Sequence, residues 1–362
     1  MNNLAFGYIC NNVPIELLET FNIKPIRLFG KKGPVTTAEN FLSVYGCSFI
    51  RAVLEEFINS NKLDGVVTAT SCDAMGVLGD LLRQIRTDIF YYNFACPINT
   101  DTPEAISFFR AEAKRFSDKL SAFTGQKFSV QQLRNAVFNY HDVHQTVNDL
   151  QNVSSKSGQD NMIPYYDLVN AGNQVGINDF ATMVNTFKNE QTSNKKEAPA
   201  NTGKKRIFLI GNSIYDQEVF SLIQDANLSI VGDLLCFSGR NFKRASNLES
   251  KINFSSCSQE ELFDFLAEKY VRQFPCAARY GVTPESDWDN LIVEEIKNSH
   301  ADGVIFLVVK YCDPHSFQHY RLKEPLEEAG IPSITIDIDF QGKFAHQILT
   351  RIEAFSEILA ER

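Results

Sequence analysis

One short pattern occurs twice in this 362-residue chain, and it limits the possible folds more than any other feature. Asp64-Gly65-Val66-Val67 leads to Cys72-Asp73, and Asp302-Gly303-Val304-Ile305 leads to Cys312-Asp313. Each copy reads as a buried strand of mainly β-branched residues that ends in a cysteine followed by an aspartate. The repetition predicts that the second half of the chain folds like the first.

Strand-like runs alternate with helical patterns along most of the chain, which is typical of βαβ units around a parallel sheet. We expect helices at residues 14–21, 48–59 and 74–83, the last with Asp73 as its N-cap. The expected strands lie at 4–8, 25–29, 65–70, 89–94, 206–210, 229–235, 303–309 and 333–337. The fold class is therefore α/β, with two parallel-sheet domains and additional helices.

Two segments between the repeats set the expected domain boundaries. The pattern from residue 103 to about residue 188 is helical, because apolar residues recur at three- and four-residue steps. Residues 189–205 are polar and lack periodicity, which is typical of a linker. We therefore predict an N-terminal α/β domain with helical cover at 1–188, a linker at 189–205 and a C-terminal α/β domain at 206–362.

The charge balance and the apolar runs exclude two classes of partner. The chain has 35 basic and 44 acidic residues, and its net charge of -9 is the wrong sign for binding a nucleic-acid backbone. Its first twelve residues lack the positive region of a signal peptide, and no apolar run is long enough to span a membrane. We expect a cytoplasmic protein with no nucleic-acid or membrane partner.

The eight cysteines are the main candidates for chemistry. Cytosolic thiols stay reduced, and because the chain has no C-x-x-C pair, any metal centre must gather cysteines from distant segments. Cys72 and Cys312 follow equivalent strands, at the end where open parallel sheets bind their ligands. Two facing domains would bring both thiols to one interdomain cleft.

Cys47 is a reasonable third ligand, since it opens a predicted helix whose N-terminus would favour its thiolate. Cys10 and Cys96 also lie near strand ends in the first half. For any single cysteine the common alternative is a small buried side chain. The pair of equivalent positions, Cys72 and Cys312, is the strongest signal that the residues alone give.

Other polar residues near these strand ends are less specific. Gly211-Asn212-Ser213 follows an expected strand, but it lacks the G-x-G-x-x-G spacing of a dinucleotide site, so a nicotinamide cofactor is disfavoured. His315 and His319 follow Cys312 at helical spacing and could act as acid or base groups or as metal ligands. A surface or structural histidine is the alternative for each.

Several motifs together resemble one family. They are Ser71-Cys72-Asp73-Ala74-Met75-Gly76-Val77-Leu78-Gly79-Asp80-Leu81-Leu82, Val309-Lys310-Tyr311-Cys312-Asp313-Pro314-His315, the opening Gly7-Tyr8-Ile9-Cys10, and Thr350-Arg351-Ile352-Glu353-Ala354-Phe355. The chain resembles the 2-hydroxyacyl-CoA dehydratase D-component and benzoyl-CoA reductase subunit family, nearly from end to end and in order. The resemblance implies two flavodoxin-like (Rossmann-like) domains with additional helices.

The resemblance also implies a cofactor and partners. In this family a [4Fe-4S] cluster is held by three cysteines, which here fall on Cys47, Cys72 and Cys312. Three thiolates leave one iron without a protein ligand, an arrangement that suits substrate coordination. The enzyme is then a heterodimer with a homologous second subunit, and a separate ATP-dependent iron-sulfur activator supplies one low-potential electron.

The implied activity is that of a lyase: ATP-driven electron injection, then radical elimination of water from a 2-hydroxyacyl-CoA through a ketyl. No catalytic residue is assigned, and the acyl-CoA pocket is expected mainly in the partner. A benzoyl-CoA reductase-like or double-cubane-cluster reductase subunit is the alternative. Pro275-Cys276 matches the family, and Cys10 and Cys236 keep this alternative open, although residues 277–279 lack a further cysteine. A cluster-free binding or scaffold protein is the alternative of another class.

Overall fold

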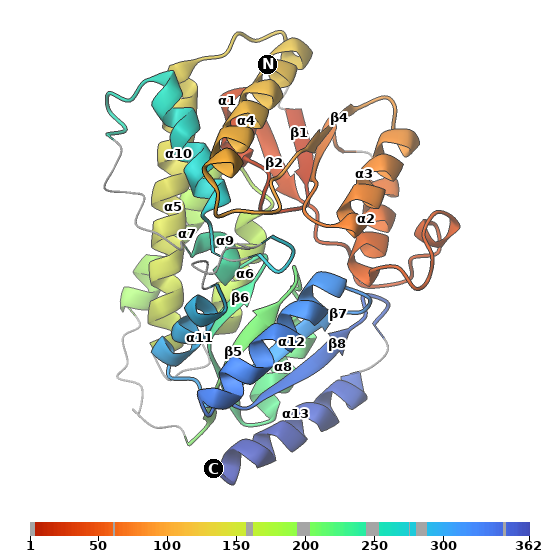
Figure 1. Cartoon of the computed structure of the whole chain (residues 1–362), viewed down its shortest axis with the longest axis vertical. Helices are drawn as coiled ribbons and strands as arrows, with labels where there is room; N and C mark the ends of the chain where they lie inside the picture. Colours follow the sequence, from red (N-terminus) through yellow and green to blue (C-terminus); the bar gives the residue numbers. More distant parts are fainter. Residues whose placement is uncertain are drawn as a thin grey trace.

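Two four-stranded, all-parallel sheets form the frame of the molecule (Figure 1). The computed structural model describes residues 4–60, 62–156, 162–193, 203–243, 253–274, 276–279, 288–342 and 345–362. The strands are β1 (Leu4–Tyr8), β2 (Ile23–Arg27), β3 (Gly65–Ala69), β4 (Phe90–Phe94), β5 (Lys205–Gly211), β6 (Leu228–Leu235), β7 (Gly303–Val309) and β8 (Ser333–Ile338). The orders β2-β1-β3-β4 and β6-β5-β7-β8 are equivalent, which confirms two flavodoxin-like domains.

Helices connect the strands and cover the sheets. They are α1 (Ile15–Thr20), α2 (Ser48–Ile58), α3 (Asp73–Ile85), α4 (Pro103–Thr124), α5 (Val130–Lys156), α6 (Met162–Gly172), α7 (Ile177–Ser193), α8 (Gln217–Asp225), α9 (Gly239–Phe242), α10 (Gln259–Val271), α11 (Trp288–Asn298), α12 (Asp313–Glu328) and α13 (Ala345–Ala360), with a 3-10 turn η1 (Ala38–Asn40). Among the described segments, none of these helices is both long and apolar enough to cross a membrane.

The repeated aspartate has the same structural role in both halves. The Asp64 carboxylate accepts a hydrogen bond from the Ala5 N–H at 2.9 Å, and the Asp302 carboxylate accepts one from the Arg206 N–H at 2.7 Å. In return, the backbone N–H of each aspartate donates to the carbonyl of the same partner residue. Each aspartate thus fixes the start of one strand against the start of its neighbour, which explains why both copies begin with this residue.

The glycine that follows each aspartate makes room for an aromatic ring. A Cβ atom on Gly65 would lie 2.7 Å from the Phe6 ring, and one on Gly303 would lie 2.8 Å from the Phe355 ring. Any side chain larger than hydrogen would push these rings away from the sheet. The Asp-Gly pair therefore combines strand alignment with close packing at both equivalent sites.

Some expected boundaries were wrong by a few residues. Cys72, not Asp73, is the N-cap of α3: its backbone is extended, with φ -153° and ψ 167°, and the helix begins at Asp73 itself. Strand β2 ends at Arg27, two residues earlier than expected. Pro25 lies inside β2, where its missing N–H is tolerated because β2 is an edge strand.

The predicted linker overlaps the end of a helix. Helix α7 continues to Ser193, so residues 189–193 are helical, while residues 194–202 lie outside the described residues and β5 begins at Lys205. The helix extends further than expected because polar residues such as glutamate, glutamine and lysine are good helix formers on an exposed face. The domain boundaries themselves stay a prediction.

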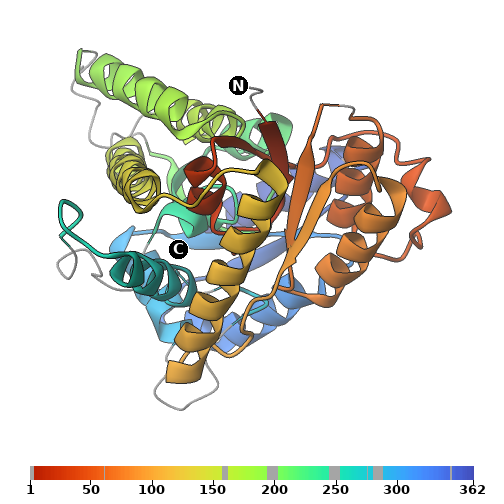
Figure 2. The ribbon, with the colours of Figure 1, turned by 90° about the horizontal axis from the view of Figure 1, so that it is seen from above.

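Helix α10, from the second half of the sequence, packs beside α4 from the first half (Figures 1 and 2). The rings of Phe109 and Tyr270 stack with centroids 5.4 Å apart. Ion pairs between Lys114 and Glu260 at 2.6 Å, and between Arg110 and Asp264 at 2.8 Å, border the contact. The two halves are therefore joined by packed helices as well as by the chain connection.

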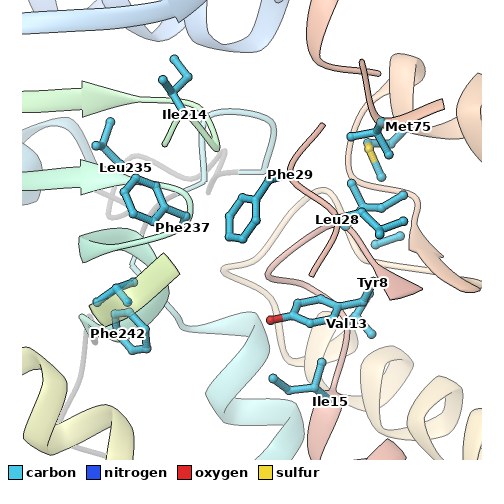
Figure 3. Packing of buried hydrophobic residues seen from close by; sticks show 14 of the residues in the cluster. Tyr8, Val13, Ile15, Leu28, Phe29, Met75, Ile214, Leu235, Phe237 and Phe242 are labelled. Carbon is cyan, nitrogen blue, oxygen red and sulfur yellow. The ribbon is translucent and has the colours of Figure 1, made fainter. Parts of the chain in front are cut away.

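A shared hydrophobic core lies where the two sheets meet. Phe29, which follows β2, and Phe237, which follows β6, form an edge-to-face pair with ring centroids 6.2 Å apart. Figure 3 shows Leu28, Phe29 and Met75 on one side, facing Leu235 and Phe237 on the other. This apolar contact fixes how the strand ends of one domain lie against those of the other.

Two glycines, Gly211 and Gly76, give a matched test of how closely β5 packs against β7. A Cβ atom on Gly211 would lie 2.2 Å from the Leu307 carbonyl oxygen, whereas a Cβ atom on Gly76 meets nothing within 4 Å. We expect Gly211→Ala to lower the free energy of unfolding by about 2–3 kcal/mol, because β5 must move away from β7. Gly76→Ala should raise it by about 0.5–1 kcal/mol, since alanine favours a helix interior. Urea unfolding measures both, and equal midpoints would contradict the register of β5 and β7.

Candidate functional site

The three cysteines singled out from the sequence share one structural position. Cys47 is the N-cap of α2, Cys72 is the N-cap of α3, and Cys312 is the N-cap of α12. The first turn of a helix presents free backbone N–H groups and a partial positive charge. Each thiol therefore lies where a negative charge is stabilised.

A hydrogen bond between the domains brings two of these helix starts together. The Ser48 N–H, next to Cys47, donates to the Lys310 carbonyl, two residues before Cys312, at 3.0 Å. Cys47 and Cys312 are each only 8% exposed, and Cys72 is partly buried. Their thiols interact electrostatically with one another, so the structure gathers all three residues at the interdomain strand ends.

The thiols of this group differ in acidity. Hydrogen bonding with the Cys312 thiol lowers the pKa of Cys47 despite burial, and the backbone N–H groups of Ile50 and Phe49 lower it further. The same contact with Cys47, together with burial, raises the pKa of Cys312. Burial raises the pKa of Cys72 to about 12. Cys47 is thus the most acidic thiol of the three, and a cation that binds thiolates would favour ionisation of the others.

Asn212 lies beside Cys312 and was not recognised as part of the site from the sequence. Its side-chain Nδ2 donates to the Cys312 Sγ atom at 3.1 Å, while its Oδ1 accepts the Val309 N–H at 2.9 Å. The second bond fixes the amide so that its N–H group points at the sulfur. The available signal was its place directly after β5, beside the switch point of the sheet, where α/β folds bind ligands.

Replacing Asn212 tests this arrangement. Asn212→Leu keeps the branched shape of the side chain but leaves the buried Val309 N–H without an acceptor, so we expect the free energy of unfolding to fall by about 1–3 kcal/mol. Asn185, in α7, is exposed, and Asn185→Leu should change it by less than about 0.5 kcal/mol. Urea titration of both variants provides the comparison. Equal stabilities would show that Asn212 does not support the Cys312 loop.

A second set of cysteines adjoins the first. The Cys10 Sγ atom lies 3.5 Å from the Ser71 hydroxyl, next to Cys72, and the Cys236 Sγ atom lies 3.9 Å from His315 Nε2. Cys276 interacts electrostatically with Cys10, Cys72 and Cys236. Burial raises the pKa of Cys236 to about 12. Pro275, the other half of the predicted Pro-Cys element, lies outside the described residues.

The remaining cysteines make local backbone contacts. The Cys96 Sγ atom lies 3.9 Å from the Asn12 carbonyl, and burial raises its pKa to about 12. Cys257 is buried, and its Sγ atom contacts the Phe254 carbonyl at 3.7 Å. Both fit the role of small buried side chains.

The two histidines have different surroundings. His315 is 7% exposed and lies against Cys236, and burial with the nearby Arg240 charge holds its pKa well below the usual range, so it is neutral. His319 packs its ring on Phe306, with centroids 4.7 Å apart. His315 therefore belongs to the site, whereas His319 packs against the core of the second domain.

The side chains at these strand ends are chiefly thiols. Over the described ranges, no group of three or more histidine, cysteine, aspartate or glutamate side chains is placed to hold a single metal ion. In an iron-sulfur cluster each thiolate binds its own iron, so the ligands surround a larger group. All eight cysteines are free thiols, and three of them start helices where the two domains meet, so their chemistry fits the thiolate ligands of such a cluster.

Comparison with known proteins identifies the family of the chain. A family model described as 2-hydroxyglutaryl-CoA dehydratase, D-component, matches residues 10–359. The (R)-phenyllactyl-CoA dehydratase beta subunit of Clostridium sporogenes is 25% identical, over 98% of this chain and 91% of the relative. The beta subunit of (R)-2-hydroxyglutaryl-CoA dehydratase from Acidaminococcus fermentans is 21% identical over 98% and 92%, and a benzoyl-CoA reductase subunit of Thauera aromatica is 22% identical over 91% and 84%. The chain therefore belongs to the 2-hydroxyglutaryl-CoA dehydratase D-component family, as its motifs predicted.

Proposed function

We propose that this chain is the iron-sulfur subunit of a 2-hydroxyacyl-CoA dehydratase-like enzyme, a lyase. The observation that carries the proposal is the meeting of Cys47, Cys72 and Cys312 at the N-termini of three helices. Three thiols from two domains, each beside free N–H groups, are suited to an anionic, thiolate-bound group. The relatives' names supply the reaction class, since several are dehydratases of 2-hydroxyacyl-CoA esters.

The three cysteines would hold a [4Fe-4S] cluster. When bound, such a cluster supplies one-electron transfer and an iron without a protein thiolate that can act as a Lewis acid. The helix N-termini favour the thiolate forms that binding needs. Asn212 donates to one ligand sulfur, and the burial of Cys47 and Cys312 keeps water from the thiols.

The reaction we propose is a redox-neutral loss of water. One electron enters the thioester carbonyl, the resulting ketyl expels the 2-hydroxyl group, the C3 hydrogen leaves as a proton, and the electron is returned as the enoyl-CoA forms. Transient reduction is needed because the C3 hydrogen of the starting ester is too weakly acidic for an ordinary base. The chain's part is to hold the electron-carrying group in a buried cleft.

Partners follow from the same proposal. Several relatives are named as beta subunits, so we propose a homologous second subunit that contributes most of the acyl-CoA pocket. An ATP-dependent iron-sulfur activator would supply the electron. The complex would work in the cytoplasm.

The test is an anaerobic assay of the complete complex. The chain is co-expressed with the proposed homologous subunit, and is supplied with activator, reductant and ATP. We expect ATP-dependent conversion of at least one of phenyllactyl-, lactoyl- and 2-hydroxyglutaryl-CoA to its enoyl-CoA, detected by mass spectrometry. Iron-loaded complex that dehydrates none of them, or that works without the electron donor, would contradict the proposal.

A reductase with a double-cubane cluster is the second candidate, favoured by the position of Cys10, Cys236 and Cys276 next to the first three cysteines. Six thiols in adjoining groups could hold eight irons rather than four. Iron analysis with Mössbauer spectroscopy separates the two candidates by cluster nuclearity. A native complex without iron would instead favour a cluster-free binding or scaffold protein.

A further inference from the structure

Two arginines are buried at matching places in the two domains. Arg27 ends β2 and is 1% exposed, and Arg240 lies in α9, shortly after β6, and is 2% exposed. Since β2 and β6 occupy the same place in their sheets, the two side chains enter the interdomain region from equivalent edges. Both reach the cysteine-bearing strand ends described above.

Each guanidinium makes only some of the hydrogen bonds that it could donate. Arg27 Nη2 donates to the Cys236 carbonyl at 3.2 Å, and Arg240 Nη2 donates to Gln318 Oε1 at 3.1 Å. In the described part of the chain, Nε and Nη1 of both residues have no hydrogen-bond partner, and neither residue forms an ion pair with a carboxylate. Arg51, equally buried, pairs with Glu39 at 3.4 Å.

An unpaired buried charge is costly, and two in one region repel each other. The effective penalty for burying an ion is several kcal/mol unless a counter-charge offsets it. Aromatic faces offset only part of it: the Arg27 guanidinium lies 5.4 Å from the Phe29 ring centroid. Among the described residues, the fold therefore keeps two buried arginine charges without a carboxylate partner.

The groups near these arginines that can become negative are the Tyr8 hydroxyl, which is hydrogen-bonded to Arg27, and two thiols. Both arginines act on Cys236, and Arg27 also acts on Cys10, in each case favouring the thiolate. Arg240 acts on His315, whose backbone N–H supports the Cys312 thiol, and it hydrogen-bonds Gln318 in the helix that Cys312 starts. The two charges thus lie beside Cys236 and the Cys312 helix, inside a region of low dielectric.

We propose that Arg27 and Arg240 offset the negative charge that an electron brings into the cleft, and so raise the reduction potential of the cluster held by Cys47, Cys72 and Cys312. This inference rests on the proposed function. A positive charge nearby stabilises the reduced, more negative cluster, and potentials of such clusters depend on local charge.

The experiment is a redox titration of the anaerobic complex, followed by electron paramagnetic resonance. Arg27→Gln and Arg240→Gln remove one charge each but keep an N–H donor. We expect each to disfavour reduction about tenfold, which is 59 mV toward negative potential for a one-electron couple. Arg240→Lys, which keeps the charge, should stay near the wild-type value, as should Arg86→Met, which removes an arginine paired with the exposed Asp88.

A second variant neutralises Arg240 without changing it. Gln318→Glu places a carboxylate at the existing hydrogen-bond partner, so the fold keeps the contact while the charge of Arg240 is compensated. We expect the same negative shift in potential, even if the glutamine variants do not fold. Unchanged potentials in iron-loaded Gln318→Glu and in the arginine variants overturn this inference and leave the proposed function intact. Wild-type complex without a cluster overturns the proposed function instead.

Discussion

Replacing Cys72 by serine should remove the iron from anaerobically purified chain, whereas Cys257→Ser should leave it bound. Cys72 is the N-cap of α3, and its thiol lies near Cys312 and Cys10. A serine hydroxyl keeps the N-cap geometry, so the helix survives, but it is a poor ligand for iron in a cluster. Iron per chain and the visible absorption of the cluster are the measurements.

Cys257 is the matched control because it is also a buried free thiol, and its Sγ atom contacts the local Phe254 carbonyl. Both variants should unfold at urea concentrations close to that of the apo wild type. Full iron content in Cys72→Ser, or an equal loss in both variants, would contradict a ligand role for Cys72. Cys47→Ser and Cys312→Ser are expected to behave like Cys72→Ser.

Lys269→Met should lower the free energy of unfolding by about 3–5 kcal/mol, because it leaves the buried Glu16 carboxylate without its cation. Lys269, in α10, pairs with Glu16, in α1, and the Tyr270 hydroxyl donates to the same carboxylate at 2.7 Å. Glu16 is fully buried and Lys269 is 5% exposed. Urea unfolding of the iron-free chain measures the effect without interference from cluster loss.

The double variant Glu16→Leu with Lys269→Met separates loss of packing from loss of charge balance. Apolar side chains of similar size often replace a buried ion pair with little loss of stability. The double variant should therefore be more stable than Lys269→Met alone, a non-additive result typical of contacting residues. Additive losses would show that the pair does not hold α10 against the first domain.

Short sequence patterns predicted the strands and the repeat, because these depend on residues that are close together in the chain. Strand β7 matches the expected residues 303–309, because six consecutive apolar residues between a glycine and a polar segment are typical of a buried parallel strand. The repeated Asp-Gly pair also predicted two equivalent domains, since the same backbone need selects the same residues. Helix starts were less certain, because cysteine is an unusual N-cap and Asp73 a common one.

Contacts between distant segments could not be predicted. Glu16 and Lys269 are separated by more than two-thirds of the chain, and each alone reads as an ordinary surface charge. Arg27 lay inside the expected strand 25–29, and Asn212 lay in a segment without the spacing of a dinucleotide site. Their roles depend on how the two domains face each other, which periodicity does not encode. Cys47, Cys72 and Cys312 could be predicted as a group only because Cys72 and Cys312 occupy equivalent places in a repeat and the motifs resemble one family.

We propose that Cys47, Cys72 and Cys312 hold one four-iron cluster in this chain. The iron and acid-labile sulfide content of the chain, purified anaerobically in its native complex, tests this proposal together with Mössbauer spectra. We expect about four irons and four sulfides per chain, in keeping with a single cubane. A native, active complex in which this chain carries no iron would contradict it.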